Sequence, residues 1–254
     1  MRKKTMLPHY HRCLIVAVMA VSSAIVNAAE VTVSAAASLT DAFREIARSY
    51  ETQHPGAKVQ LNFGASGALM QQIAKGAPVD VFASADLETM DQAQKQGLIA
   101  ERQDFTRNAL VLILPADSRL MVGALGDLGQ AGVKRITMGN PAVAPIGRYA
   151  RRALENANLW SAIEPRIIHA QNVRQALDYV VRGEVDAGFV FATDAAVMKD
   201  KVKVAFNVPV DVPMTYPIGR VAAGPNGAEA KRFIAYVMSP AGQEALARFG
   251  FLKP

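Results

Sequence analysis

Ser38, Ser66 and Ser84 each follow a short apolar segment with strand-like character and precede a stretch with helical patterning. A serine at such a turn stands beside the free N–H groups and the positive dipole end of the helix that follows. The three turns contain alanine and glycine but no lysine or arginine. Uncharged donors of this kind suit an oxyanion that carries no proton and can only accept hydrogen bonds.

Two turns in the second half of the chain resemble them. Pro145-Ile146-Gly147 places proline where helix starts favour it, and Asn172 has the N-cap spacing to Gln175. A single serine or asparagine before a helix is ordinarily only a cap. Several such turns at the same edge of a sheet favour an anion-binding site.

The segment FGASGAL (63–69) also resembles the nucleophile turn of serine hydrolases, in which glycine stands two residues after the serine. Here Ala68 occupies that position, and the chain after its leader has only His54 and His169. Hydrolase chain order leaves His169 as the one histidine for a triad with Ser66. A serine hydrolase that uses Ser66 therefore remains as the enzymatic alternative.

Residues 1–28 have the features of a secretory signal peptide. Four basic residues accompany an apolar run over 13–26, and small residues precede a cleavage site after Ala28. The chain has a net charge of +6, but the leader carries four basic and no acidic residues, so the exported protein has +2. The only cysteine, Cys13, is removed with the leader. An exported chain without cysteine fits the bacterial periplasm, with an extracellular location as the alternative.

Several functional classes lack their signals in this sequence. No basic stripe interleaved with aromatic residues indicates nucleic-acid binding. No H-x-x-x-H spacing, cysteine pair or dense carboxylate cluster of the exported chain predicts a metal site or a metal cofactor.

Strand-like and helical segments alternate along the exported chain and predict an α/β protein with parallel strands. Two similar halves indicate two lobes that face a cleft, each with a mixed, mainly parallel sheet flanked by helices. We assign residues 30–107 and 219–254 to lobe I and residues 108–218 to lobe II.

A set of segments in this chain is similar to the periplasmic molybdate-binding proteins of ABC transporters. The first three segments, found in this order, carry most of the specificity. The segments are AAASLT (35–40), GASGAL (64–69), GAPVDVFASAD (76–86), PIGRYA (145–150), NVRQAL (172–177) and RFGF (248–251). The resemblance covers essentially the whole exported chain.

The resemblance implies a type II periplasmic-binding-protein fold whose two lobes close on molybdate or tungstate. By position it implies that Ser38 and Ser66 bind the anion through their hydroxyls. The backbone amides of Ile146 and Val173 would bind it from lobe II, with Ile146 standing where the family often has alanine. Ala36 and Ala85 are weaker candidates.

Phe191 departs from the family pattern, which commonly places a tyrosine hydroxyl on the anion at this position. The loss of one charge-assisted hydrogen bond costs about 1.5–3 kcal/mol, so the substitution affects affinity and anion preference. Thr193 or a water molecule would be a substitute donor.

These observations predict a monomeric periplasmic receptor that binds molybdate, and tungstate as well. It would deliver the anion to the permease of an ABC transporter in the inner membrane, with no cofactor and no nucleic-acid partner. A receptor for another tetrahedral oxyanion, such as sulfate, remains the alternative within the same class.

Overall fold

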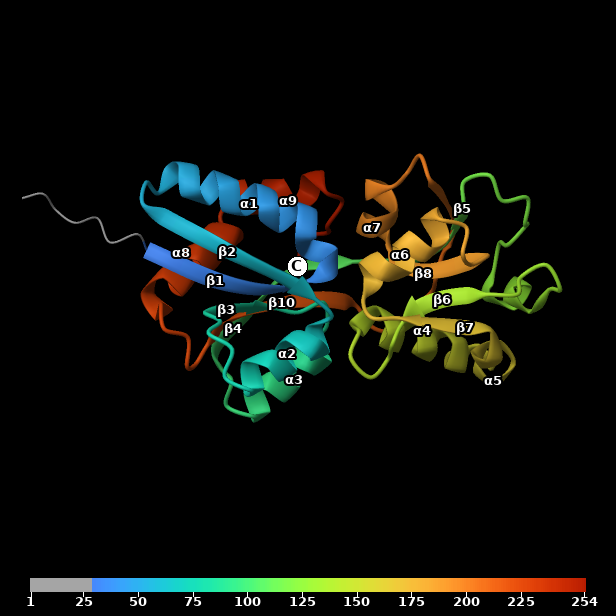
Figure 1. Ribbon diagram of the computed structural model, residues 1–254, viewed down its shortest axis with the longest axis horizontal. Helices are drawn as coiled ribbons and strands as arrows, with labels where there is room; N and C mark the ends of the chain where they lie inside the picture. Colours follow the sequence, from blue (N-terminus) through green and yellow to red (C-terminus); the bar gives the residue numbers. More distant parts are fainter. Residues whose placement is uncertain (1–28) are drawn as a thin grey trace, which may run out of the picture.

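The computed structural model describes residues 29–254, which form two lobes side by side along the long axis of the molecule (Figure 1). The signal peptide expected at residues 1–28 lies outside the described residues. Each lobe contains one five-stranded sheet, with the strand orders β2-β1-β3-β10-β4 and β7-β6-β8-β5-β9. Helices cover both faces of each sheet, so the predicted two-lobed α/β architecture is confirmed.

Lobe I combines the first part of the chain with its C-terminal part. Its strands are β1 (Ala29–Ala36), β2 (Ala57–Gly64), β3 (Val81–Ala83), β4 (Ile99–Asn108) and β10 (Met214–Val221). Its helices are η1 (Ala37–Leu39), α1 (Thr40–Gln53), α2 (Ser66–Ala74), α3 (Leu87–Lys95), α8 (Gly227–Met238) and α9 (Pro240–Arg248). α1, α8 and α9 pack together on one face of the sheet, and α2 and α3 cover the other (Figure 1).

Lobe II is formed by the middle of the chain. Its strands are β5 (Leu110–Pro115), β6 (Ile136–Gly139), β7 (Ile167–Ala170), β8 (Ala187–Phe191) and β9 (Val202–Asn207). Its helices are η2 (Leu125–Gly129), α4 (Pro145–Asn156), α5 (Trp160–Ile163), η3 (Glu164–Arg166), α6 (Val173–Val181) and α7 (Ala192–Val197). α4 packs on the face of the sheet opposite to α6 (Figure 1).

Both sheets are mixed. β1 pairs in parallel with β2 and β3, whereas β10 runs antiparallel to β3 and β4. β6 likewise pairs in parallel with β7 and β8, and β5 runs antiparallel to β8 and β9. The helix or turn after each parallel strand therefore begins at the edge of the sheet where a ligand site is expected in open α/β folds.

The chain crosses between the lobes at Ala109 and over residues 208–213. The sequence analysis assigned 108–218 to lobe II, but β10 begins at Met214 and pairs with strands of lobe I along its length. Residues 214–218 therefore belong to the sheet of lobe I. Their apolar pattern indicates a buried strand but does not show which sheet accepts its hydrogen bonds.

The sequence analysis also missed β4 and β9. Both strands lie at an edge of their sheet: β4 exposes Glu101, Arg102, Gln103 and Asp104, and β9 exposes Lys203, Val204 and Asn207. Edge strands carry polar and charged side chains that interrupt the apolar alternation of a strand. The interior strands, which helices cover on both faces, have the continuous apolar runs that made them recognisable.

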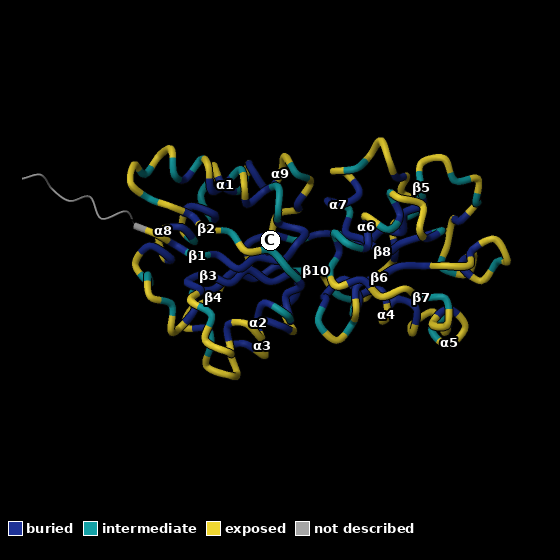
Figure 2. The backbone as a smooth tube through the Cα atoms, in the orientation of Figure 1, coloured by how far each residue is buried: buried dark blue, intermediate teal, exposed yellow. Residues whose placement is uncertain are grey.

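Burial follows the two sheets and continues across the junction of the lobes (Figure 2). A single cluster of buried apolar side chains includes residues of both lobes, and a smaller one lies beneath α2 and α3. Within residues 29–254, no helix combines the length and apolar character needed to cross a membrane.

Gly147 allows α4 to approach β6 closely. A Cβ atom at this position would lie only 1.9 Å from the carbonyl oxygen of Gly139, which is backbone and cannot turn away. This approach sets the position of the first turn of α4, which contains Ile146.

We expect Gly147→Ala to lower the free energy of unfolding by more than about 2 kcal/mol, because the added methyl overpacks the contact with Gly139. The measurement is chemical denaturation followed by circular dichroism. Gly126→Ala is the matched control in lobe II, because a Cβ there meets no atom within 4 Å. Equal stability of the two variants would contradict the close approach.

Candidate oxyanion site

A small, nearly closed cavity of about 10 Å³ lies between the two lobes. Its lining residues come from turns at the ends of strands and the first turns of helices, in both lobes. They are Ala36, Ala37, Ser38, Gly64, Ala65, Ser66, Ala85, Ala144, Pro145, Ile146, Asn172, Val173 and Phe191. None of these side chains carries a charge.

The structure brings all five residues predicted for the site to this one cavity, and each is at most 4% exposed. Ser38 lies in η1, Ser66 begins α2, Val173 begins α6, and Ile146 is the second residue of α4. The first N–H groups of a helix have no acceptor within it, so three helix starts direct free donors and positive dipole ends at the same place. Phe191 ends β8 and supplies an apolar wall.

Ser66 acts as an acceptor within the protein. Its Oγ accepts a hydrogen bond of 3.0 Å from the backbone N–H of Ala85. The N-cap of α2 is Ala65, so Ser66 does not have the capping role that a serine before a helix ordinarily has. Because its oxygen already faces a donor, its own proton is available to a group in the cavity.

Ser38 is not a cap either, although Asp41 follows it at the three-residue spacing of a capping box. The N-cap residue of α1 is Leu39, and no side chain caps this helix. Ser38 Oγ instead lies 3.0 Å from the hydroxyl of Tyr216, a residue 178 positions away in the chain. Asn172 does have the predicted role, since its Oδ1 accepts from the N–H groups of Arg174 and Gln175.

Gly67 forms a direct contact between the lobes. Its backbone N–H donates to the carbonyl oxygen of Val143 over 2.9 Å, and a Cβ at this position would lie 2.8 Å from the same oxygen. The second glycine of FGASGAL therefore allows lobe II to approach next to Ser66.

Two arginines of lobe II connect the lobes beside the cavity. Arg148 Nη2 lies 2.5 Å from an Asp86 carboxylate oxygen and donates to Thr89 Oγ1 over 2.6 Å. Arg174 Nη1 lies 2.8 Å from Asp41. Each arginine follows a cavity residue within two positions, yet both charges are neutralised by carboxylates outside the cavity.

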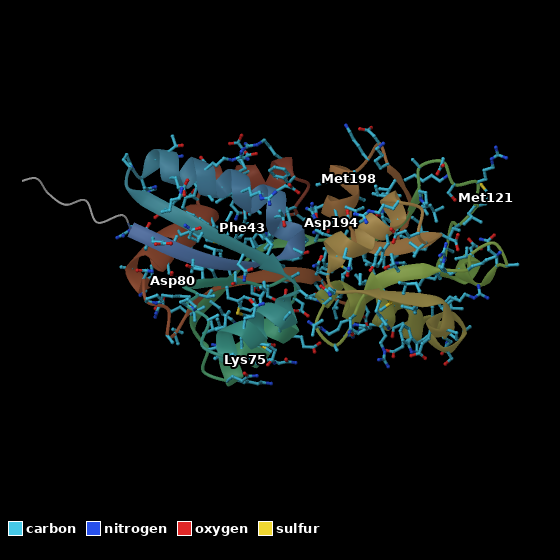
Figure 3. All side chains as sticks on the ribbon, viewed as in Figure 1. Phe43, Lys75, Asp80, Met121, Asp194 and Met198 are labelled. Atoms are coloured by element: carbon cyan, nitrogen blue, oxygen red, sulfur yellow. The ribbon has the colours of Figure 1, made fainter. Side chains whose placement is uncertain are left out.

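Asp194 pairs with Arg174 from within lobe II, where its carboxylate lies 2.5 Å from Nε of the arginine. Figure 3 shows Asp194 on the side of lobe II nearest lobe I. Complete burial raises the pKa of Asp194 to about 6, although the charge of Arg174 opposes the shift. The same arginine thus contacts carboxylates from both lobes.

Thr193, the hydroxyl expected to replace a tyrosine at position 191, does not line the cavity. Its Oγ1 accepts a hydrogen bond from Asn108 Nδ2 over 2.9 Å. Phe191 packs edge-on against Tyr216, with ring centroids 5.7 Å apart. Tyr216 and Asn108 were missed by the sequence analysis, because nothing local indicates that a strand after the second crossing contacts Ser38.

Within the described residues 29–254, no histidine lines the cavity beside Ser66. The two histidines of residues 29–254, His54 and His169, are both absent from the cavity lining. His54 stacks on Tyr50 at the end of α1, and His169 is exposed on β7. The base that a serine nucleophile requires is therefore not supplied by either residue.

A larger groove of about 980 Å³ lies between α1, α7 and α9. Its walls carry charges of both signs, among them Arg44, Arg48, Lys58 and Glu51. The small cavity is the better candidate site because its donors are neutral, buried and convergent, and because no carboxylate acceptor lines it. Such a set can bind an anion whose oxygens all accept hydrogen bonds.

Comparison with known proteins gives a family and several relatives. Residues 31–252 match the model of the family described as bacterial extracellular solute-binding protein. The molybdate-binding protein ModA of Haemophilus influenzae is 35% identical over 236 residues, which cover 88% of this chain and 90% of the relative. ModA of Escherichia coli is 35% identical over 242 residues, covering 90% and 91%.

Among solved structures, the periplasmic molybdate-binding protein of Azotobacter vinelandii has the same fold, with a TM-score of 0.77. The match covers 88% of this chain and 99% of that structure, at 24% sequence identity.

We expect Gly67→Ala to weaken the binding of molybdate, the anion expected from the sequence, by about fivefold or more. The methyl would meet the Val143 carbonyl and oppose the approach of the lobes, at a cost of about 1–3 kcal/mol. Calorimetry measures the affinity, and small-angle X-ray scattering measures compaction on adding the anion.

Gly227→Ala is the control for this variant in lobe I. A Cβ at Gly227 has only ordinary contacts, the nearest at 3.6 Å from Arg220. Unchanged affinity and compaction in Gly67→Ala would show that the contact with Val143 is not needed for binding.

Proposed function

The chain belongs to the family of bacterial extracellular solute-binding proteins, and on that basis we propose that it is a periplasmic receptor for molybdate. The proposal extends to tungstate, which has the same shape and charge. The two ModA relatives support it, because each is about one-third identical to this chain over nearly its whole length.

The donor set of the cavity is the observation that carries this proposal. Two serine hydroxyls and the first N–H groups of α4 and α6 converge on a space lined by no charged side chain. Molybdate carries no proton near neutral pH, so all of its oxygens are acceptors. Each charge-assisted hydrogen bond from a neutral donor contributes roughly 1.5–3 kcal/mol, so four converging donors suffice for tight binding without a cation.

Closure of the two lobes follows from the division of the donors. Ser38 and Ser66 belong to lobe I, whereas Ile146 and Val173 belong to lobe II. Only the closed arrangement completes the set, so a bound anion selects it. The contacts of Gly67, Arg148 and Arg174 between the lobes stabilise the same arrangement.

We further propose that the closed receptor delivers its anion to the permease of an ABC transporter in the inner membrane. One chain supplies the whole lining of the cavity, which is consistent with a receptor that acts as a monomer. The proposal includes no catalytic step, no cofactor and no nucleic-acid partner.

Sulfate is the alternative ligand, because it is also a tetrahedral dianion without a proton. The observation that favours it is Phe191, which supplies no hydroxyl at the position where a tyrosine is expected to bind molybdate. The order of affinities distinguishes the two anions.

Isothermal titration with molybdate, tungstate, sulfate and hydrogen phosphate tests the proposal. We expect molybdate and tungstate to bind most tightly. Ser38→Ala and Ser66→Ala should each weaken molybdate binding tenfold to a hundredfold, because each removes one charge-assisted hydrogen bond. The double variant should nearly abolish binding.

Ser49→Ala is the control, because Ser49 bonds to Tyr236 outside the cavity. Tighter binding of sulfate would support the alternative ligand. The absence of heat with both molybdate and tungstate would refute the proposed function, and ester hydrolysis that Ser66→Ala abolishes would support the hydrolase.

Phe191→Tyr tests the departure from the family pattern. We expect tighter molybdate binding, by about tenfold or more, because the new hydroxyl adds a donor at the wall of the cavity. The affinity is measured by calorimetry. Phe189→Tyr is the control, because Phe189 lies two residues earlier on β8 and does not line the cavity. An unchanged affinity would mean that the donor set is already complete.

A further inference from the structure

Asn108 has a fixed orientation at the end of β4. Its Oδ1 accepts a 2.9 Å hydrogen bond from the backbone N–H of Ala109, which can only donate. The amide nitrogen must therefore point the other way. Nδ2 donates to Thr193 Oγ1 over 2.9 Å and to the hydroxyl of Tyr216 over 3.3 Å.

The direction of the next hydrogen bond follows from this orientation. Tyr216 is fully buried, and its hydroxyl oxygen accepts from Asn108. Its single proton needs an acceptor, and among the described residues Ser38 Oγ, at 3.0 Å, is the remaining hydrogen-bond partner. A buried hydroxyl proton without an acceptor is costly, so Tyr216 donates to Ser38. Burial raises the pKa of Tyr216 well above its ordinary value, which keeps this proton in place.

Ser38 consequently directs its own proton into the cavity. The tyrosine proton occupies one lone pair of the serine oxygen, so the proton of Ser38 is not used by Tyr216 and is free to donate to an anion in the cavity. The proton of Ser66 is also free to donate into the cavity, because the oxygen of Ser66 accepts from the N–H of Ala85. Both hydroxyls are thereby held as donors.

We propose that Tyr216, oriented by Asn108, is a positioning residue that holds Ser38 as a donor and makes the site select oxyanions without a proton. This inference rests on the proposed function. A protonated anion such as hydrogen phosphate brings a donor into a cavity where each serine oxygen already accepts one hydrogen bond and no carboxylate is present. A serine that accepted from this anion would have to turn its own proton away from it, so one of the two protons would lose its acceptor, which lowers the affinity.

The first experiment is calorimetry on Tyr216→Phe with molybdate, sulfate and hydrogen phosphate. The affinities of the anions that bind more weakly are measured by their competition with molybdate. We expect molybdate and sulfate affinities to fall together, about fivefold to tenfold, because Ser38 loses the bond that orients it. Hydrogen phosphate should keep its affinity or gain, because a lone pair of Ser38 becomes free to accept. Discrimination against it should therefore drop about tenfold.

Tyr236→Phe is the matched control, because Tyr236 forms the same kind of tyrosine–serine pair with Ser49 at 2.7 Å, away from the cavity. It should leave all three affinities unchanged. Equal weakening of all three anions in Tyr216→Phe would indicate a purely structural role and overturn the proposal. Unchanged molybdate affinity would overturn it as well.

Asn108→Asp provides a second, independent test that also applies if Tyr216→Phe folds poorly. A carboxylate at this position accepts the proton of Tyr216, so Ser38 must donate to Tyr216 and is withdrawn from the anion. We expect molybdate affinity to fall more than tenfold. The same or higher affinity would contradict the proposed direction of the bonds.

The added negative charge of Asn108→Asp repels the anion by itself, and a double-mutant cycle separates this effect. In the Tyr216→Phe background there is no tyrosine hydroxyl whose hydrogen bond to Ser38 could change direction. Asn108→Asp should therefore lower molybdate affinity by a smaller factor there than in the unchanged protein. An equal loss of affinity in both backgrounds would overturn the inference. Failure of the unchanged protein to bind either molybdate or tungstate would instead refute the proposed function.

Discussion

An anion can be held without a positive side chain only where several neutral donors converge and no acceptor competes with them. The cavity between the lobes meets this condition with two serine hydroxyls and the first turns of α2, α4 and α6. Helix starts are effective here because their N–H groups have no acceptor within the helix and their dipoles add positive potential. The two sheets, with the same pattern of parallel and antiparallel pairing, bring these starts together from both lobes.

The requirement for neutral donors also explains the surroundings of the cavity. Arg148 and Arg174 lie close to cavity residues on α4 and α6, but Asp86 and Asp41 of lobe I neutralise them. The arginines therefore connect the lobes and do not present an unpaired positive charge to an anion in the cavity. Gly67 and Gly147 permit close backbone approaches, one between the lobes and one within lobe II. At both positions a larger residue would place its Cβ atom against a backbone carbonyl oxygen.

Most of the fold could be predicted from the sequence, because helices cover the interior strands on both faces and give them continuous apolar runs. Two of the four edge strands, β4 and β9, were not predicted, since exposed polar residues interrupt their apolar patterns. The end of lobe II was misplaced for a related reason, because the pattern of β10 shows a buried strand but not its hydrogen-bond partners. The candidate site followed from turn residues and a family resemblance, and its five residues do line one cavity.

The sequence by itself determined which groups are available: serines and free helix starts at strand ends, and phenylalanine at position 191. These are local properties that a turn shows in its own residues. Only the tertiary structure decided how the groups are used. Ser38 meets Tyr216, Ser66 meets Ala85, and Gly67 meets Val143, all across long separations in the chain. The direction of a hydroxyl proton depends on the partner behind it, and packing of distant segments alone supplies that partner.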